Sequence, residues 1–211
     1  MSNTKIYYCG ENGITYKLFS ELTAKGKLNR LLHNITWEDE TLKDELLYEK
    51  IISVYLFPCF GRRHGPGEPD AIIKTEKHNI FFELETCEFK KLPKHFFRQM
   101  NSFIDIGFDI SYSPRKSMRK KNGYKWISNK RTKGFFRNRK LFKDLLGSGK
   151  EPLFVVIAEG DLTQKNDLFS NDKNKLPVAS KKFFGFINYY TVKRMKGKLR
   201  IAEIINFNLK A

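Results

Sequence analysis

The sequence predicts an α/β protein with a central mixed β-sheet flanked by helices. Segments rich in aromatic and β-branched residues, typical of strands, alternate along the chain with longer segments whose apolar residues recur at helical spacing. One apolar run, 153–158, lacks alternation and is typical of a strand covered on both faces. Of the 211 residues, 40% are hydrophobic and 14% aromatic, enough to build one core. We therefore expect a single domain over 1–211, with a basic insertion at about 113–150.

The first part of the chain is expected to contain a hairpin followed by a long helix. The pair Asn12-Gly13 lies between two aromatic and β-branched runs, which predicts a β-hairpin over 6–19. Thr36 precedes acidic residues in the next turn, as is typical of a helix N-terminus. Apolar residues at helical spacing then extend this helix over 42–56. One of its faces should pack on the sheet.

A second hairpin and a second helix follow a loop rich in glycine and proline at 57–69. Segments 70–74 and 79–85 are predicted strands joined by a short polar turn, and Pro93 begins the helix. One face of that helix is apolar and carries Phe96, Phe97, Met100, Phe103 and Ile104. Beyond the basic insertion, three more strands are predicted at 153–158, 183–192 and 199–209.

The charge of the chain favours a polyanionic partner. The chain has 40 Lys and Arg residues against 23 Asp and Glu residues, a formal net charge of +17. A surplus of this size repels itself unless an anionic partner relieves it, which makes nucleic acid the first candidate. The alternative is a basic soluble protein with no such partner.

Cysteine use and hydropathy indicate a cytoplasmic protein without a membrane partner. The longest apolar runs fall far short of the roughly 20 residues that cross a bilayer, and the N-terminus lacks the continuous apolar region of a signal peptide. Cys9, Cys59 and Cys87 are odd in number and widely spaced, without the pairing of a zinc site. We expect reduced thiols in the cytoplasm.

The residues expected to carry chemistry lie on the second hairpin. Side chains alternate along a strand, so Glu83 and Glu85 share one face. A turn centred between Glu76 and Lys77 places Asp70 on that same face, opposite one of the two glutamates. Three converging carboxylates repel one another unless they are protonated or bind a cation, and such oxygen ligands suit Mg²⁺ or Mn²⁺. The alternative is a solvated strand face that happens to be acidic.

Asp70, preceded by proline and followed after twelve residues by Glu83-Leu84-Glu85, resembles the signature of the PD-(D/E)xK nuclease superfamily. The resemblance covers about residues 42–102 and implies a restriction-endonuclease-like core. It also implies metal-dependent hydrolysis of phosphodiester bonds. In that reaction Asp70 and Glu83 would hold Mg²⁺ or Mn²⁺, and Glu85 would be a ligand or the group that receives a proton from water.

The resemblance implies further residues around this site. The segment 48–56 is similar to the family's first helix, whose glutamate helps bind metal, and this implies a role for Glu49, with Glu45 one turn earlier as the reserve. Gln99 falls where some members carry a glutamine near the site. His64, six residues before Asp70, is a candidate phosphate contact or base, and the alternative is an incidental surface histidine.

One position departs from the family. The family's lysine would fall at Glu85, although a small group of type II restriction enzymes is similar in having E-x-E. The change makes the site more negative and removes the usual cation, so the need for divalent metal should be stricter. A displaced cation would come from Lys90, Lys91 or Lys94.

The residues expected to contact DNA lie in the basic insertion and in the loop before Asp70. Between Arg115 and Lys150 there are fourteen Lys or Arg residues and one acid, with aromatic residues interleaved. Positive charges neutralise phosphates and aromatic rings stack on bases, whereas the alternative is a solvated loop anchored by its aromatics. The predicted contacts are Arg62, Arg63, Lys120, Lys121, Lys125, Trp126, Lys130, Arg131, Arg137 and Arg139.

The leading functional prediction is a Mg²⁺-dependent DNA endonuclease, such as a type II restriction enzyme that acts as a homodimer on a two-fold site. The first alternative is a non-catalytic DNA-binding protein on the same fold, which the missing lysine favours. The second is an RNA-binding or RNA-processing protein, because basic and aromatic residues do not distinguish DNA from RNA.

Overall fold

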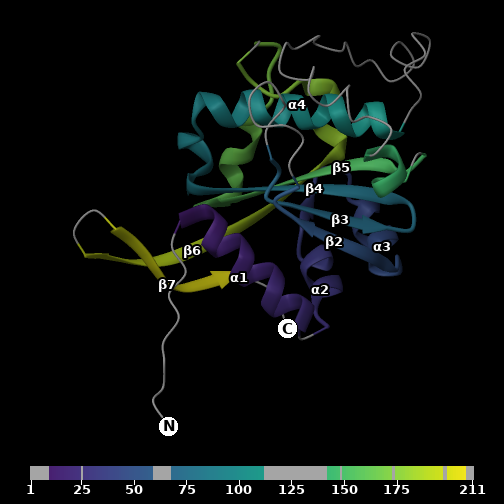
Figure 1. Ribbon diagram of the computed structural model, residues 1–211. Helices are drawn as coiled ribbons and strands as arrows, with labels where there is room; N and C mark the ends of the chain where they lie inside the picture. Colours follow the sequence, from purple (N-terminus) through teal and green to yellow (C-terminus); the bar gives the residue numbers. More distant parts are fainter. Residues whose placement is uncertain are drawn as a thin grey trace.

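The computed structural model describes residues 10–24, 26–58, 68–111, 142–147, 149–172, 174–196 and 199–207. These residues form a seven-stranded mixed sheet with helices on both of its faces (Figure 1). Helix α4 (Lys94–Ser111) lies on one face, and α1 (Gly10–Ala24), α2 (Leu28–His33) and α3 (Thr41–Leu47) lie on the other. The predicted α/β class is therefore confirmed.

The sheet combines an antiparallel meander with parallel strands. In order across the sheet its strands are β1 (Thr36–Trp37), β6 (Phe184–Lys196), β5 (Glu151–Glu159), β4 (His78–Glu88), β3 (Ala71–Thr75) and β2 (Ile51–Leu56). Strand β7 (Leu199–Phe207) pairs with β6. Strand β3 is antiparallel to both β2 and β4, whereas β5 and β6 run parallel to β4. Three 3₁₀ helices, Phe89–Lys91, Leu162–Leu168 and Val178–Phe183, connect these elements.

The second hairpin and the central strand follow the sequence prediction. Ala71 pairs with Phe82 and Lys74 with Asn79, one of the two registers expected from the turn position. Residues 153–158 of β5 are fully buried, because the strand lies between β4 and β6 in the sheet and packs against α4. The two C-terminal strands also form as predicted, with β6 between β5 and β7.

Helix α4 covers the centre of the sheet with its predicted apolar face. Its five predicted apolar residues are all buried, and the ring of Phe103 stacks on Phe81 of β4 with centroids 6.5 Å apart. Gly107 allows the closest approach, since a Cβ there would lie 2.8 Å from the Cβ of Pro152. Among the described helices, none combines the length and apolar character needed to cross a bilayer.

The predicted N-terminal hairpin is wrong, because this segment forms helix α1. Its apolar residues recur at helical spacing, which gives one continuous face on the sheet, and Phe19 packs edge-on against Phe82 with centroids 5.2 Å apart. The energy of burying this face outweighs the turn preference of Asn12-Gly13. The buried residues of the face are Ile14, Leu18, Phe19 and Leu22.

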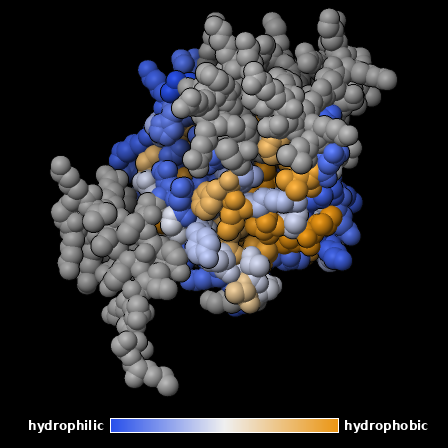
Figure 2. All heavy atoms as spheres, viewed as in Figure 1, coloured by the Kyte–Doolittle hydropathy of each residue, from blue (hydrophilic) through white to orange (hydrophobic). Residues whose placement is uncertain are grey.

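The predicted helix at 36–56 is also wrong in extent. Thr36 belongs to strand β1, and α3 starts at Thr41, where the Asp39 carboxylate accepts hydrogen bonds from the backbone N–H (3.1 Å) and the hydroxyl (2.7 Å) of Thr41. The β-branched run at 51–56 forms edge strand β2, since short apolar runs fit helical and strand patterns equally well. Figure 2 shows hydrophobic surface in this region, and Ile52 of β2 is half exposed.

Candidate active site

The β3–β4 hairpin brings Asp70, Glu83 and Glu85 to one end of the sheet, as predicted. The backbone N–H of Asp70 donates to the carbonyl of Phe82 (3.0 Å), which continues the hairpin register and places Asp70 opposite Glu83. The Asp70 carboxylate accepts a hydrogen bond from the backbone N–H of Leu84 (2.7 Å). All three carboxylate residues are buried, with exposures of 7%, 6% and 5%.

A fourth carboxylate joins them from helix α1. Glu11 lies in the first turn of α1, and its Oε1 is 3.4 Å from the backbone N–H and 3.3 Å from the hydroxyl of Thr86, both donors. Its negative charge contributes to the raised pKa values of Asp70, Glu83 and Glu85. Glu11 was not predicted, because its segment was expected to form a hairpin. An acidic residue at the start of an amphipathic helical pattern is typical of a helix N-terminus and could have indicated its position.

Three carboxyl groups of this acidic cluster (Glu11, Asp70, Glu83 and Glu85) have raised pKa values. Burial raises the pKa of Asp70 to about 7; the charge of Glu11 adds to this effect, whereas the hydrogen bond from the backbone N–H of Leu84 opposes it. Burial and the charge of Glu11 raise the pKa of Glu85 to about 8. Burial and the charges of Asp70 and Glu85 raise the pKa of Glu83 well above its usual range. Within the described residues, no lysine or arginine forms an ion pair with the cluster.

The donor set fits a hard divalent cation. Glu83 Oε2 is buried and has no hydrogen-bond partner among the described residues, so it is an oxygen ligand that the protein itself leaves unused. Carboxylate oxygens are the ligands that Mg²⁺ and Mn²⁺ prefer, and a cation would relieve the part of the pKa increase that repulsion causes. Asp70, Glu83 and Glu85 lie on one face of the hairpin with the exposed Glu11 beside them, although no three of their carboxylates come close enough to share one ion without movement of the side chains.

Residues around the cluster position its backbone. The Gln99 side chain donates a hydrogen bond to the carbonyl of Glu68 (3.2 Å), two residues before Asp70. The buried Tyr189 lies on β6, and its hydroxyl donates a hydrogen bond to the backbone carbonyl of Glu85 (2.7 Å). Gln99 is thus close to the site, as the sequence analysis expected, whereas Tyr189 was not foreseen.

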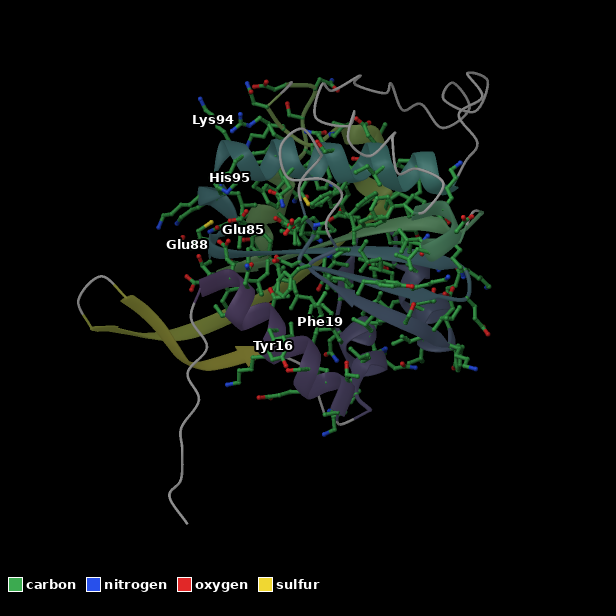
Figure 3. All side chains as sticks on the ribbon, in the orientation of Figure 1. Tyr16, Phe19, Glu85, Glu88, Lys94 and His95 are labelled. Carbon is green, nitrogen blue, oxygen red and sulfur yellow. The ribbon has the colours of Figure 1, made fainter. Side chains whose placement is uncertain are left out.

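The expected displaced lysine is engaged elsewhere. Lys91 and Lys90 pair with Glu88, at 2.7 Å and 3.1 Å, rather than with the acidic cluster. A group with a potential positive charge that does lie near Glu85 is His95, whose Nε2 is 3.9 Å from Glu85 Oε1. Figure 3 shows Glu85, His95 and Lys94 at the same end of the sheet, where α4 begins.

The structure separates Glu49 from the acidic cluster. Glu49 lies between α3 and β2, and its Oε2 accepts hydrogen bonds from the hydroxyl of Thr75 and the backbone N–H of Lys77. Thr75 is at the turn end of the hairpin, five residues along β3 from Asp70, or about 17 Å. The prediction that Glu49 is a ligand beside Asp70 and Glu83 is wrong, because the helix expected to carry it there ends at Leu47.

The remaining predicted contacts fall outside the described residues. Arg62, Arg63 and His64 lie in the segment 59–67, and the candidates from Lys120 to Arg139 lie in 112–141. Their roles stay predictions. Comparisons of the chain with protein-family models, curated proteins and solved structures find no match. Function has to be argued from the site itself.

Proposed function

We propose that the protein is a metal-dependent nuclease that hydrolyses phosphodiester bonds of DNA at the acidic cluster. The observation that carries this proposal is the burial of Asp70, Glu83 and Glu85 on one face of the hairpin in a chain of net charge +17, with no lysine or arginine pairing with them among the described residues. Such an arrangement costs stability when it is bare and is useful when it holds a cation. The resemblance of Asp70 and Glu83-Leu84-Glu85 to the nuclease signature supports the same conclusion.

Each carboxylate has a role that its surroundings favour. A bound Mg²⁺ or Mn²⁺ polarises a phosphodiester, lowers the pKa of a coordinated water and steadies the leaving oxygen. Asp70 and Glu83 would hold it, since Asp70 is fixed by the Leu84 N–H and Glu83 has an unused oxygen. Glu85, with a pKa raised to about 8, is suited to accept a proton at its carboxylate near neutral pH.

The substrate class is inferred from charge and from the exposed cations beside the cluster. Lys94 and His95 are exposed in the first turn of α4, at the positive end of the helix dipole, where a phosphate is favoured. The excess of basic residues in the insertion supplies additional phosphate contacts. DNA is the polyanion that the nuclease resemblance specifies.

Cleavage of supercoiled plasmid with Mg²⁺, Mn²⁺ or EDTA tests the proposal. We expect nicking or linearisation that needs the metal and that falls by at least about a hundredfold in Asp70→Asn and Glu83→Gln, because removing a metal-holding charge forfeits several kcal/mol of transition-state stabilisation. Glu88→Gln, on the same strand but paired with lysines, is the matched control and should cut normally. Normal cutting by Asp70→Asn and Glu83→Gln would refute the assignment.

A second candidate function, DNA binding without catalysis, is favoured by one observation. Glu85 stands where the family has lysine, and the neighbouring Lys90 and Lys91 are engaged with Glu88. Retention of plasmid in gel shifts without cutting under any metal would support this candidate over the nuclease. Cleavage of single-stranded RNA but not of plasmid would instead make RNA the substrate.

A further inference from the structure

A second group of potential ligands lies at the opposite end of the β3–β4 hairpin. Glu45 at the end of α3, Glu49 before β2 and His78 at the start of β4 each place one ligand atom within 4.8 Å of the others. Glu49 and His78 are buried, with exposures of 4% and 2%. Two carboxylates from neighbouring positions of the chain and one imidazole from the later hairpin thus lie close together.

The pair at the centre of this group consists of His78 Nδ1 and Glu49 Oε1. These two buried atoms are 2.8 Å apart, and neither has a hydrogen bond to any other group of the described residues. Two ligands about 2.1 Å from a tetrahedral zinc ion lie about 3.4 Å apart, so zinc would enter between these two atoms by widening their 2.8 Å separation by about 0.6 Å.

Neighbouring groups hold the side chains of His78 and Glu49 in orientations that suit metal ligands. Glu151 Oε2 is 3.9 Å from Nε2, on the far side of the His78 ring, where a carboxylate favours a proton on Nε2 and leaves the lone pair of Nδ1 for a metal. Glu49 Oε2 is held by Thr75 and the backbone N–H of Lys77, which leaves Oε1 directed at His78. Glu45 currently pairs with Lys77 Nζ at 3.0 Å.

We propose that Glu45, Glu49 and His78 form a structural zinc site that ties α3 and the strand β2 to the turn of the β3–β4 hairpin. An imidazole with two carboxylates suits Zn²⁺ better than Mg²⁺, which prefers oxygen ligands alone. The site is about 17 Å from the acidic cluster, so it supplies no group to the chemistry there. Zinc would displace Lys77 from Glu45, and water would complete its coordination.

Zinc binding is measured by equilibrium dialysis with metal analysis, on a background that carries Asp70→Asn and Glu83→Gln so that the acidic cluster does not contribute. We expect about one Zn²⁺ per chain, and with Co²⁺ the visible absorption of a nitrogen- and oxygen-ligated ion. Glu45→Gln should weaken binding at least tenfold without unfolding the apo protein, because Glu45 is largely on the surface. Lys77→Ala should tighten binding, since it frees Glu45.

Two matched variants separate this site from ordinary surface binding. Asp44→Asn removes the neighbouring exposed acid of α3, and His95→Ala removes an exposed histidine beside Glu85; neither should alter zinc binding. No zinc bound by the folded background protein would show that Glu49 and His78 are only an ion pair and would overturn the proposal. Equal losses in Asp44→Asn and Glu45→Gln would overturn it as well.

Discussion

The two ends of the β3–β4 hairpin carry buried carboxylates in opposite electrostatic settings. At the Asp70 end, burial and the neighbouring negative charges raise the pKa values of Asp70, Glu83 and Glu85, and no lysine or arginine of the described residues pairs with them. At the Thr75 end, Glu49 has a hydroxyl, a backbone N–H and His78 within reach, and Glu45 pairs with Lys77. Among the described residues, a lysine and a histidine therefore pair with the acids at the Thr75 end, whereas no lysine or arginine pairs with those at the Asp70 end.

This difference teaches how to tell a site from a structural ion pair. Burying a charge costs several kcal/mol unless an opposite charge or hydrogen bonds offset the lost hydration. A group of buried acids without such partners is therefore expected where a bound ligand, such as a cation, supplies the opposite charge. A compensated group needs no such explanation for its charge. At the Thr75 end, the proposed zinc site depends instead on the ligand atoms of Glu45, Glu49 and His78, which lie within 4.8 Å of one another.

The largest expected effect is a contrast in sign between neutralising substitutions at the two ends. In EDTA at pH 8, Glu49→Gln should lower the free energy of unfolding by about 3–5 kcal/mol, because it leaves buried His78 without its partner. Glu83→Gln should raise it by about 1–3 kcal/mol, because it removes a buried charge that repels its neighbours and has an unpartnered oxygen. Urea denaturation with a constant slope measures both.

The matched control for this contrast is Glu88→Gln. Glu88 lies on β4 near the acidic cluster, but its carboxylate is at the surface with two lysines, so its stability should stay within about 0.5 kcal/mol of wild type. If Glu83→Gln destabilises as much as Glu49→Gln, the two ends are equivalent and the distinction drawn between them fails. A stabilised but inactive Glu83→Gln is the signature of a functional site.

A smaller effect is the pH dependence that the acidic cluster imposes. In the unfolded chain Asp70 and Glu85 titrate near 3.8 and 4.5, whereas in the folded protein their pKa values are about 7 and about 8. The folded state then holds protons that the unfolded state has released, so these groups reduce stability as pH rises from about 4 to 8. Wild type should lose stability across that window relative to the double variant Asp70→Asn, Glu85→Gln.

Thermal melts in EDTA from pH 4 to 9 measure this difference. Glu88→Gln should not reproduce it, because hydrogen bonds from Lys91 and Lys90 lower the pKa of Glu88, and removing that group changes stability in the opposite sense. Saturating Mn²⁺ should shrink the difference between wild type and the double variant, since a cation keeps the carboxylates ionised. Parallel pH curves for wild type and the double variant would contradict the raised pKa values.

The sequence was informative where one local pattern had one structural solution. The hairpin at 70–85 was predictable because its turn and alternation specify register, and α4 because Phe96, Met100 and Phe103 repeat over several turns. The segment before residue 57 was not, since both of its errors arose from short patterns. Asn12-Gly13 competes with an amphipathic face, and the run 51–56 is compatible with helix or strand.

The two errors in the N-terminal region also explain why Glu11 was not predicted and why Glu49 was placed at the wrong end of the hairpin. Asp70, Glu83 and Glu85 depend only on the register of one hairpin, and the structure brings them together. Glu11 and Glu49 depend on which element of the N-terminal region packs against that hairpin, and tertiary packing settles this rather than local sequence. The predicted strand therefore carries the clustered carboxylates, whereas the glutamate beside them is Glu11 rather than Glu49.

The smallest expected effect concerns Tyr189, which holds the backbone of Glu85 while its carboxylate is left uncompensated. Tyr189→Phe removes the 2.7 Å hydrogen bond to the Glu85 carbonyl and should lower the free energy of unfolding by about 1 kcal/mol, or about 2–4 °C in Tm. Cleavage should fall only a few fold, since strand pairing still places the side chain. Tyr48→Phe, at an exposed tyrosine, should change neither quantity. A loss of cleavage in Tyr189→Phe as large as that in Glu83→Gln would mean that the backbone position of Glu85, rather than the charge of the acidic cluster, limits the reaction.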